Sequence, residues 1–197
     1  MESAFYFDLF SPMAYMAAER VLTVVPAPCP WVPILARSLP GAEGFDAYRC
    51  ETDMLAARDV IERRARVLGL PPIVWPAQFP FDSERAMLAA TYARQIGKGV
   101  AFALAAFRQA FAGGNALDVE ETILIAGAAC EMHPRAILQA LETRSVRAEL
   151  ERATSEAREL GVTDVPAVRI GDQVIFGEGK LEQLSALSPA AGGLRAL

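Results

Sequence analysis

The first part of the chain combines a short apolar run with a longer run that has helical spacing. Residues Ala4–Leu9 form a short run that is rich in aromatic side chains, which is typical of a strand. Ser11 and Pro12 end this run, and Met13–Val25 follow with the periodicity of a helix. Because serine before a helix and proline in its first turn are common start signals, we predict a strand, a turn and a helix.

Strand-like segments recur at Trp31–Leu35 and near the other end of the chain. Pro33 within the first of them favours the edge of a sheet or an early strand end, because proline donates no hydrogen bond to a neighbouring strand. Residues Val165–Ile170 and Val174–Phe176 flank Gly171-Asp172, a dipeptide that favours a hairpin turn. We therefore predict two strands in each end region.

Helical patterns fill the chain between these two regions. Residues that can cap a helix through a side-chain oxygen stand at several of the expected starts, namely Asp53, Asp82, Ser83 and Asp118. The predicted helices, including a short one after the last strand, cover residues 53–68, 83–96, 100–111, 118–131, 134–141, 145–160 and 180–187.

The order of the elements is therefore β-α-β, a long helical block and β-β-α. Two strands near each end fit a single mixed sheet, whereas a plain doubly wound sheet would not have so many helices in succession. We predict an α/β protein, a thioredoxin-like domain with a large all-helical insertion. The domain comprises residues 1–50 and 160–187, the insertion 53–159, and a loose tail 188–197.

Composition limits the possible partners. The formal net charge is −5 and no block of basic residues occurs, so we expect no nucleic-acid partner. Apolar residues make up 53% of the chain, but no run is long enough to cross a membrane. Glu2 and Asp8 interrupt the pattern of a signal peptide, so we expect a cytoplasmic protein without membrane association.

Cysteine and histidine restrict the chemistry. Cys29, Cys50 and Cys130 form no C-x-x-C pair and no metal-ligand spacing, so we predict reduced and inert thiols. His133 is the single histidine and precedes Pro134 at a predicted helix start, where a structural role is favoured. A metal site with two histidines is excluded by this count.

Ser11 is the first candidate for a catalytic residue. Backbone N–H groups at the start of a helix favour negative charge, and a serine hydroxyl there can donate a hydrogen bond to a bound thiolate. The alternative is a purely structural role as the helix cap. Ser11 and Ala14 occupy the positions at which a thioredoxin-type oxidoreductase has the cysteines of C-x-x-C, which argues against disulfide exchange.

Val165-Pro166, just before the third predicted strand, is the second candidate. A cis bond there would turn the backbone N–H and C=O groups before the proline outward, where they can pair with an extended peptide-like ligand. An ordinary trans proline at the first residue of a strand is the alternative. The sequence leaves both interpretations open.

A stretch rich in proline and aromatic residues separates two of the predicted helices. Trp75, Phe79 and Phe81 offer flat apolar side chains there, and we predict that they form a wall for a small aromatic substrate. Packing of the insertion against the core is the alternative for each of them. Arg58 and Asp59 in the preceding helix are expected to form a structural pair, with contact between Arg58 and a substrate carboxylate as the alternative.

Short motifs along the chain carry a specific resemblance, which extends to about Leu187. They are Phe5-Tyr6-Phe7-Asp8, Ser11-Pro12, Tyr15, Trp31-Val32-Pro33-Ile34-Leu35, Arg58-Asp59, Phe79-Pro80-Phe81-Asp82-Ser83, Gly161-Val162, Val165-Pro166-Ala167, Phe176-Gly177 and Leu181. With these motifs the chain resembles the 2-hydroxychromene-2-carboxylate isomerase family, which is related to kappa-class glutathione transferases and to DsbA-type thioredoxin-fold proteins.

This resemblance implies a glutathione-dependent isomerase of aromatic catabolism. The implied reaction is cis–trans isomerisation of an unsaturated aromatic keto-acid, in which the glutathione thiolate adds to the conjugated double bond and then leaves. The resemblance places Ser11 at the glutathione sulfur, and the backbone of Val165, beside Pro166, at the peptide part of glutathione. It also implies a homodimer, no metal and no net redox change.

The positions expected to hold the γ-glutamyl group differ from the family pattern, which has an acidic residue followed by arginine. Here the matching positions are Gly179 and Lys180, and Glu178 stands one place earlier. Lysine still binds a carboxylate, although without the bidentate geometry of arginine. We expect Glu178 and Lys180 to hold this end of glutathione, with Arg37 as the nearby cation in place of a lysine of the family.

Two other functions stay open at this point. One is a kappa-like glutathione transferase or peroxidase on the same scaffold, and the other is a non-catalytic binding protein that has lost glutathione binding. Activity with a general electrophile favours the first function. The absence of any effect of glutathione on the melting temperature favours the second.

Overall fold

The computed structural model describes residues 3–25, 29–41 and 51–181. Cys50, the predicted helix beyond residue 181 and the predicted tail at 188–197 lie outside these residues. The helices and strands, in chain order, are β1 (Ser3–Phe7), α1 (Pro12–Val24), β2 (Trp31–Pro33), the 3-10 helix η1 (Ala36–Ser38), α2 (Glu51–Val67), α3 (Glu84–Gln95), α4 (Gly99–Phe111), α5 (Glu120–Ala128), α6 (Pro134–Leu141), α7 (Arg144–Glu159), β3 (Ala167–Ile170), β4 (Gln173–Phe176) and the 3-10 helix η3 (Glu178–Lys180).

The strands form one mixed sheet in the order β2-β1-β3-β4, which confirms the sheet predicted from the two end regions. Strand β1 runs parallel to β2 and antiparallel to β3, with Tyr6 opposite Ala167. Strands β3 and β4 form the predicted hairpin. Strand β2 lies at the edge of the sheet and ends at Pro33, in agreement with the effect expected of a proline.

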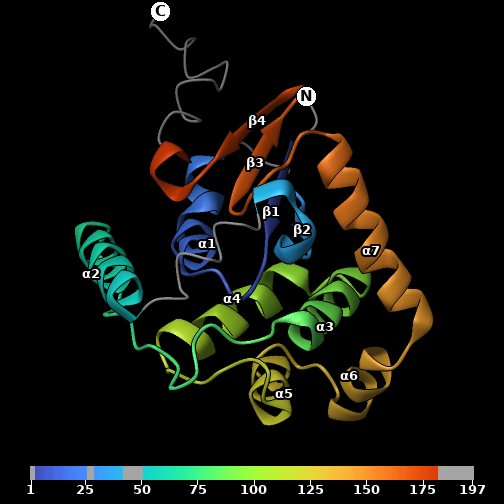
Figure 1. Ribbon diagram of the computed structural model, residues 1–197. Coiled ribbons are helices and arrows are strands. Elements are labelled where there is room, and N and C mark those ends of the chain that lie inside the picture. The colour runs from blue at the N-terminus through green and yellow to red at the C-terminus, as the bar shows by residue number, and fades with distance from the viewer. Residues whose placement is uncertain (1–2, 26–28, 42–50, 182–197) are drawn as a thin grey trace, which may run out of the picture.

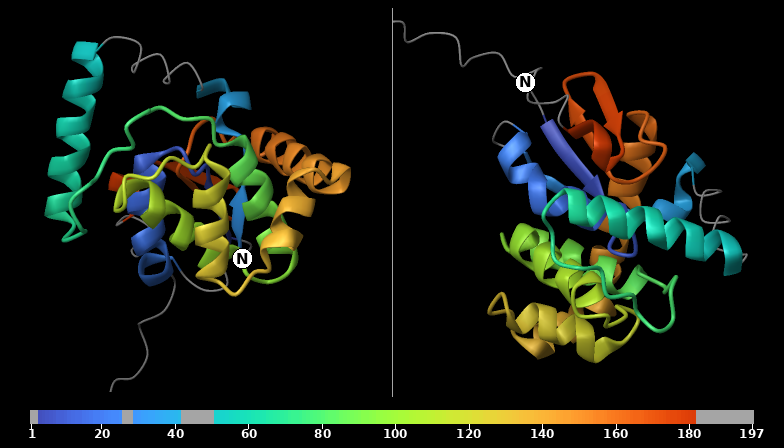
Figure 2. Two further views of the ribbon diagram at one scale, coloured as in Figure 1. Left: turned by 90° about the horizontal axis from the view of Figure 1, so that it is seen from below. Right: turned by 90° about the vertical axis from the view of Figure 1, so that its left-hand side faces the viewer.

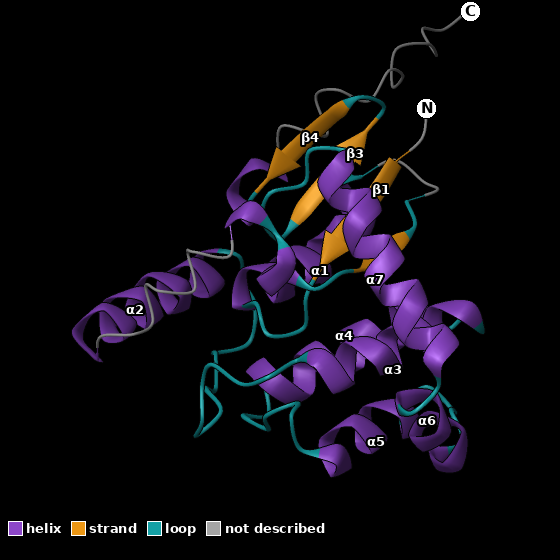
Figure 3. Cartoon of the chain, turned by 45° about the vertical axis from the view of Figure 1, so that its right-hand side comes forward, coloured by secondary structure: helices purple, strands orange, loops and turns teal. Residues whose placement is uncertain are grey.

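Helices cover both faces of the sheet. In Figure 1, α1 lies on one side of β1 and α7 on the other, whereas α3 to α6 gather at one end of the molecule. Figure 3 shows the strands at the opposite end, with α7 extending along both parts. In the left view of Figure 2, α2 stands apart from the other helices. The helices between the strands thus occupy the place expected for a large insertion.

Strand β1 is buried because helices cover each of its faces. Side chains alternate along a strand, so Phe5 and Phe7 share one face. On that face the ring centroids of Phe7 and Phe107 in α4 are 5.8 Å apart, and those of Phe107 and Tyr15 in α1 are 6.2 Å apart. Aromatic pairs of this kind contribute about 0.5–1.5 kcal/mol each beyond simple burial, so these contacts help to fix α1 and α4 on the sheet.

Two predicted helix caps are wrong in position. Helix α2 has already begun at Glu51, so Asp53 lies within its first turn rather than before it. Helix α5 follows Val119 and ends at Ala128, with no side-chain cap from Asp118. An acidic side chain in or just before the first turn also favours a helix through the helix dipole, which explains why the sequence signal was right about the helix but wrong about the cap.

Glu178 links three separate elements by ion pairs. It lies in η3, its side chain has no exposed surface, and it accepts a hydrogen bond of 2.7 Å from Nε of Arg64 in α2. Arg20 of α1 contacts the same carboxylate. These partners are 114 and 158 positions away in the sequence. The carboxylate of Glu178 therefore connects α1 and α2 to the segment after β4 by ion pairs.

We predict that Glu178→Ala lowers the free energy of unfolding by about 3 kcal/mol, because it removes the buried carboxylate that two arginines share. Denaturant titration followed by circular dichroism measures the difference. Asp59→Ala is the matched control, since it removes an exposed pair with Arg63 on α2 and is expected to cost about 0.5 kcal/mol or less. Equal losses in the two variants would contradict the role given to Glu178.

Candidate functional site

Ser11 caps helix α1 just beyond the carboxyl end of β1, which confirms the predicted helix start, while its catalytic role stays a prediction. Its Oγ accepts a hydrogen bond of 3.1 Å from the N–H of Ala14, and Pro12 occupies the first helical position. The residue is 5% exposed. No described residue accepts the hydroxyl proton, so Ser11 keeps one hydrogen-bond donor at the start of the helix.

Val165-Pro166 lies at the same end of the sheet as Ser11. Because Tyr6 pairs with Ala167 in antiparallel register, one further step brings the proline opposite Phe7. The bond between Val165 and Pro166 is cis. The two candidate segments, one from each end region of the chain, therefore adjoin paired ends of β1 and β3, and their roles at a ligand stay predictions.

The backbone N–H of Val165 has a partner within the protein. It donates a hydrogen bond of 2.7 Å to Oδ1 of Asp164, the residue before it. Burial raises the pKa of Asp164, and this N–H lowers it in part. A peptide-like ligand that uses the same donor must therefore compete with the Asp164 carboxylate.

The two residues expected at the γ-glutamyl group lie close together in η3 but differ in their surroundings. Glu178 is fully buried between Arg20 and Arg64. Lys180 is exposed, and it forms no ion pair within the described part of the chain. Of the two, Lys180 is the one that a ligand reaches directly.

A cavity of about 240 Å³ lies between the end of β1 and the start of α3, and its lining includes Phe10 but not Ser11, Val165 or Pro166. Its lining residues are Asp8, Phe10, Arg37, Pro80, Phe81, Asp82 and Ser83. Arg37 pairs there with Asp82 at 3.2 Å and with Glu84. Two larger hollows among the described residues, of about 530 and 600 Å³, contain none of the predicted site residues.

The three predicted wall residues belong to one aromatic cluster. Ring centroids are 5.0 Å apart for Trp75 and Phe79, and 6.1 Å apart for Phe79 and Phe81. Phe111, at the end of α4, contacts all three rings. Phe81 is the member that lines the cavity, Phe79 is buried, and Trp75 is half-buried.

Asp8 lines the cavity but was not among the predicted site residues, although it ends the motif Phe5-Tyr6-Phe7-Asp8. Its Oδ2 accepts a hydrogen bond of 2.9 Å from the N–H of Ala36, and its Oδ1 one of 3.3 Å from the N–H of Phe10. Burial raises the pKa of Asp8 to about 6, against the opposing effects of Ser83, the two N–H groups and Arg37. A charged residue at the end of an apolar strand is the sequence signal that would have found it.

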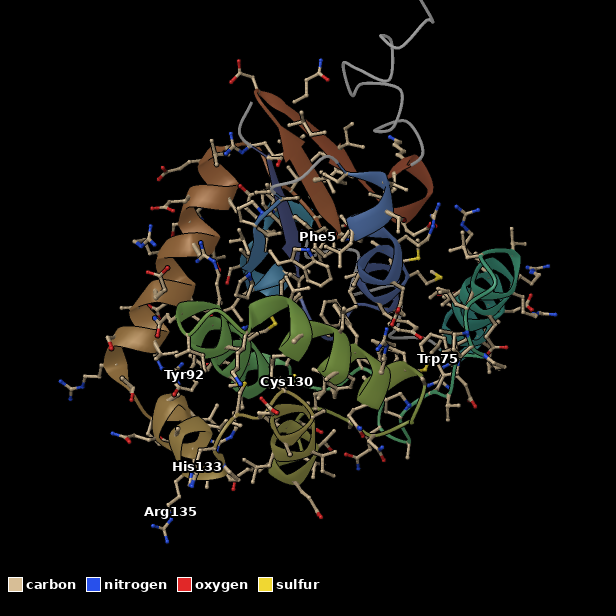
Figure 4. The ribbon with its side chains drawn as sticks, turned by 180° about the vertical axis from the view of Figure 1, so that it is seen from behind. Phe5, Trp75, Tyr92, Cys130, His133 and Arg135 are labelled. Carbon is tan, nitrogen blue, oxygen red and sulfur yellow. The ribbon has the colours of Figure 1, made fainter. Side chains whose placement is uncertain are left out.

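Cysteine and histidine lie outside this site in the described part of the chain. Cys29 and Cys130 are free thiols, and burial raises the pKa of both. His133 caps α6, as expected, and Figure 4 shows it far from Trp75. Among the described residues, no cluster of histidine, cysteine and acidic side chains suits a metal ion, and no helix has the length and apolar character needed to cross a membrane.

Asp8 makes stability depend on pH in a defined direction. Its pKa is about 6 in the folded protein, against an ordinary value of 3.8, so the folded state holds the extra proton between these two values. The stabilisation linked to Asp8 is therefore fully present below about pH 4 and is lost as the pH rises through about 6. The loss amounts to about 2–3 kcal/mol.

We predict that Asp8→Asn removes this pH dependence. The quantity to measure is the difference in free energy of unfolding between wild type and variant, obtained by denaturant titration from about pH 4 to about pH 8. Asparagine also loses one acceptor at every pH, so only the pH-dependent part of the difference counts. Asp172→Asn, in the exposed hairpin turn, is the control. A difference for Asp8→Asn that stays constant over this range would refute the assignment.

Comparison with known proteins places the chain in a family. A family profile described as a DSBA-like thioredoxin domain matches residues 4–187. No curated protein matches the sequence. Among solved structures, a 2-hydroxychromene-2-carboxylate isomerase is similar, with a TM-score of 0.83 and 22% identity over 95% of this chain and 94% of that chain.

Oxidoreductases have the same fold. A probable DsbA oxidoreductase from Streptomyces coelicolor has a TM-score of 0.74 and 18% identity, with 100% of this chain and 92% of that chain covered. The cytosolic disulfide reductase DsbM from Pseudomonas aeruginosa has a TM-score of 0.65 and 16% identity, with 95% and 96% covered. These likenesses confirm the predicted thioredoxin-like fold, and with the profile match they show that the chain belongs to the DSBA-like thioredoxin domain family.

Proposed function

We propose that the protein is a glutathione-dependent cis–trans isomerase of an unsaturated aromatic keto-acid. The observation that carries this proposal is the buried Ser11, whose hydroxyl keeps a donor at the start of α1, at the same end of the sheet as Val165-Pro166. The similarity in fold to a 2-hydroxychromene-2-carboxylate isomerase supports the reaction class. A structure of DsbM with GSH supports glutathione as the ligand. We propose a cytoplasmic homodimer that acts in aromatic catabolism.

Ser11 would act on the sulfur. Bound glutathione supplies a thiolate, which adds reversibly to the conjugated double bond so that this bond can rotate. A free thiol has a pKa of about 8.5, so most of it is protonated at neutral pH. The Ser11 hydroxyl and the N–H groups of the first turn of α1 stabilise the anion. Lowering the pKa of the thiol by about one unit needs about 1.4 kcal/mol, roughly the contribution of one charge-assisted hydrogen bond.

The segment after β4 would hold the γ-glutamyl end. Lys180 contacts its carboxylate directly, because this lysine is exposed. Glu178 acts through the two arginines that it orients, Arg20 and Arg64. Both guanidinium groups carry the positive charge that an anionic ligand requires.

The cavity would hold the aromatic ring of the substrate, with Arg37 as the cation at its wall. Val165-Pro166 lies outside the lining of this cavity and would present its backbone to the peptide part of glutathione. Phe81 offers an apolar face to the aromatic ring, with Phe79 and Trp75 packed behind it. The cavity of about 240 Å³ sets the scale of the group that it accepts, a small aromatic ring.

A non-catalytic binding protein is the second candidate, and one feature favours it. The Val165 N–H and the Glu178 carboxylate, both expected to contact glutathione, already have internal partners. A chain that had lost glutathione binding would have no reason to keep these groups open to a ligand.

We predict that glutathione raises the melting temperature and binds with measurable heat in calorimetric titration, because a ligand that binds only the folded state stabilises it. Addition of an unsaturated aromatic keto-acid should then give turnover. No thermal shift at large excess of glutathione would favour the binding-protein alternative. Turnover of a general electrophile without isomerisation would indicate a kappa-like glutathione transferase.

We predict that removal of the Ser11 hydroxyl raises the pKa of bound glutathione by about one unit and slows turnover about tenfold at neutral pH. Ser11→Ala and Ser11→Gly test this together, since glycine preserves helix capping better than alanine does. Ultraviolet absorbance of the thiolate during a pH titration gives the pKa. Ser38→Ala, in exposed η1, is the control. An effect of Ser11→Ala that Ser11→Gly does not share would point to lost helix stability instead.

A further inference from the structure

Arg58 in α2 lacks a polar partner within the described part of the chain. Its Nε is buried, and no described atom accepts a hydrogen bond from it. The structural pair expected between Arg58 and Asp59 is wrong, because Asp59 pairs with Arg63 at 2.8 Å. The next carboxylate on the helix, Glu62, accepts a hydrogen bond of 2.8 Å from Nε1 of Trp75. Both neighbouring acids are therefore engaged elsewhere.

Trp75 is the contact that Arg58 does make. The guanidinium carbon lies 5.0 Å from the centre of the indole ring. Phe79 and Phe111 pack against the same indole, and Glu62 holds its N–H, so the ring has a fixed orientation. Figure 4 shows Trp75 between α2 and the end of α4.

A cation–π contact does not satisfy the guanidinium group. The contact favours the positive charge, but it provides no acceptor for the five N–H donors of an arginine. An arginine in this state suits a planar anion, because its donors match the two oxygens of a carboxylate. Arg58 and Trp75 are each only partly buried, so a small ligand can reach the indole and the terminal N–H groups of the guanidinium, although not the buried Nε.

We propose that Arg58 and Trp75 recognise the carboxylate of a planar aromatic acid, with the guanidinium bound to the two carboxylate oxygens and the indole against the ring. The inference rests on the proposed function for the aromatic acid as the substrate class. The proposal assigns substrate selection to α2. The ion pair between Arg64 and Glu178 connects this helix to the segment after β4. Phe79 connects this pair with Phe81 at the cavity wall.

The test compares two probes that differ only in charge, cinnamate and cinnamamide, by calorimetric titration without glutathione. We expect the wild type to bind cinnamate at least about tenfold more tightly than cinnamamide. Arg58→Met keeps the apolar stem and should reduce this preference to less than about twofold, whereas Arg58→Lys should keep part of it. Arg63→Met is the matched control, because Arg63 lies on the same helix, is exposed and has its own acidic partner.

Fluorescence places the bound probe. In a Trp31→Phe background, Trp75 is the single tryptophan, and the substitution removes no hydrogen bond because Nε1 of Trp31 has no partner among the described residues. Cinnamate should quench Trp75 emission in this background, and Arg58→Met should weaken the quenching. Melting temperatures confirm that each variant is folded.

Two results would overturn the inference. One is equal affinity of the wild type for cinnamate and cinnamamide, and the other is an unchanged preference in folded Arg58→Met. The outcome is independent of the glutathione experiments. Charge selection by Arg58 without glutathione binding would reject the proposed function and leave the recognition site. Glutathione-dependent turnover with no role for Arg58 would support the proposed function and reject the recognition site.

Discussion

The antiparallel pairing of β1 with β3 is the constraint on which the rest of the structure depends. The two strands come from opposite end regions of the chain, and all helices from α2 to α7 lie between them in sequence. Closing so long a connection costs entropy, which is offset by burying β1 between strands on both sides and helices on both faces. The pairing also fixes the register. Ser11 and Val165-Pro166 therefore lie at the same end of the sheet, whatever the insertion between them contains.

Much of this architecture could be predicted because periodicity reports which positions are buried. The pattern predicted α6 with its observed bounds, Pro134–Leu141, and the proline rule gave the edge position of β2. Ser11 was found by the same kind of local rule, since a cap is recognised from a few adjacent residues. Asp53 and Asp118 show the limit of such rules. The same acidic residue suits the cap and the first turn, and only the backbone decides between them.

The polar partners in the site could not be predicted, because packing brings them together from distant segments. Nothing local to Glu178 indicates that arginines 114 and 158 positions away will enclose it. Arg58 shows that a residue of opposite charge next in the sequence need not be a partner. Its neighbour in the sequence is an aspartate, yet helix geometry turns that carboxylate towards Arg63, four residues further along. Sequence patterns identify the face of an element, but the choice of partner is made in three dimensions.

The positions of charged groups that are costly to bury support a functional site near the aromatic cluster of Trp75, Phe79 and Phe81. Arg108 pairs with Glu19, and Arg64 with Glu178, so charges that hold elements together are matched. Among the groups whose burial is costly are the carboxylate of Asp8 and Nε of Arg58, which has no hydrogen-bond acceptor among the described residues. Both adjoin a single aromatic cluster, since Asp8 and Phe81 line one cavity and Arg58 lies on Trp75. Groups whose burial is costly are enriched at functional sites, and the position of these two around one aromatic cluster supports a ligand site there.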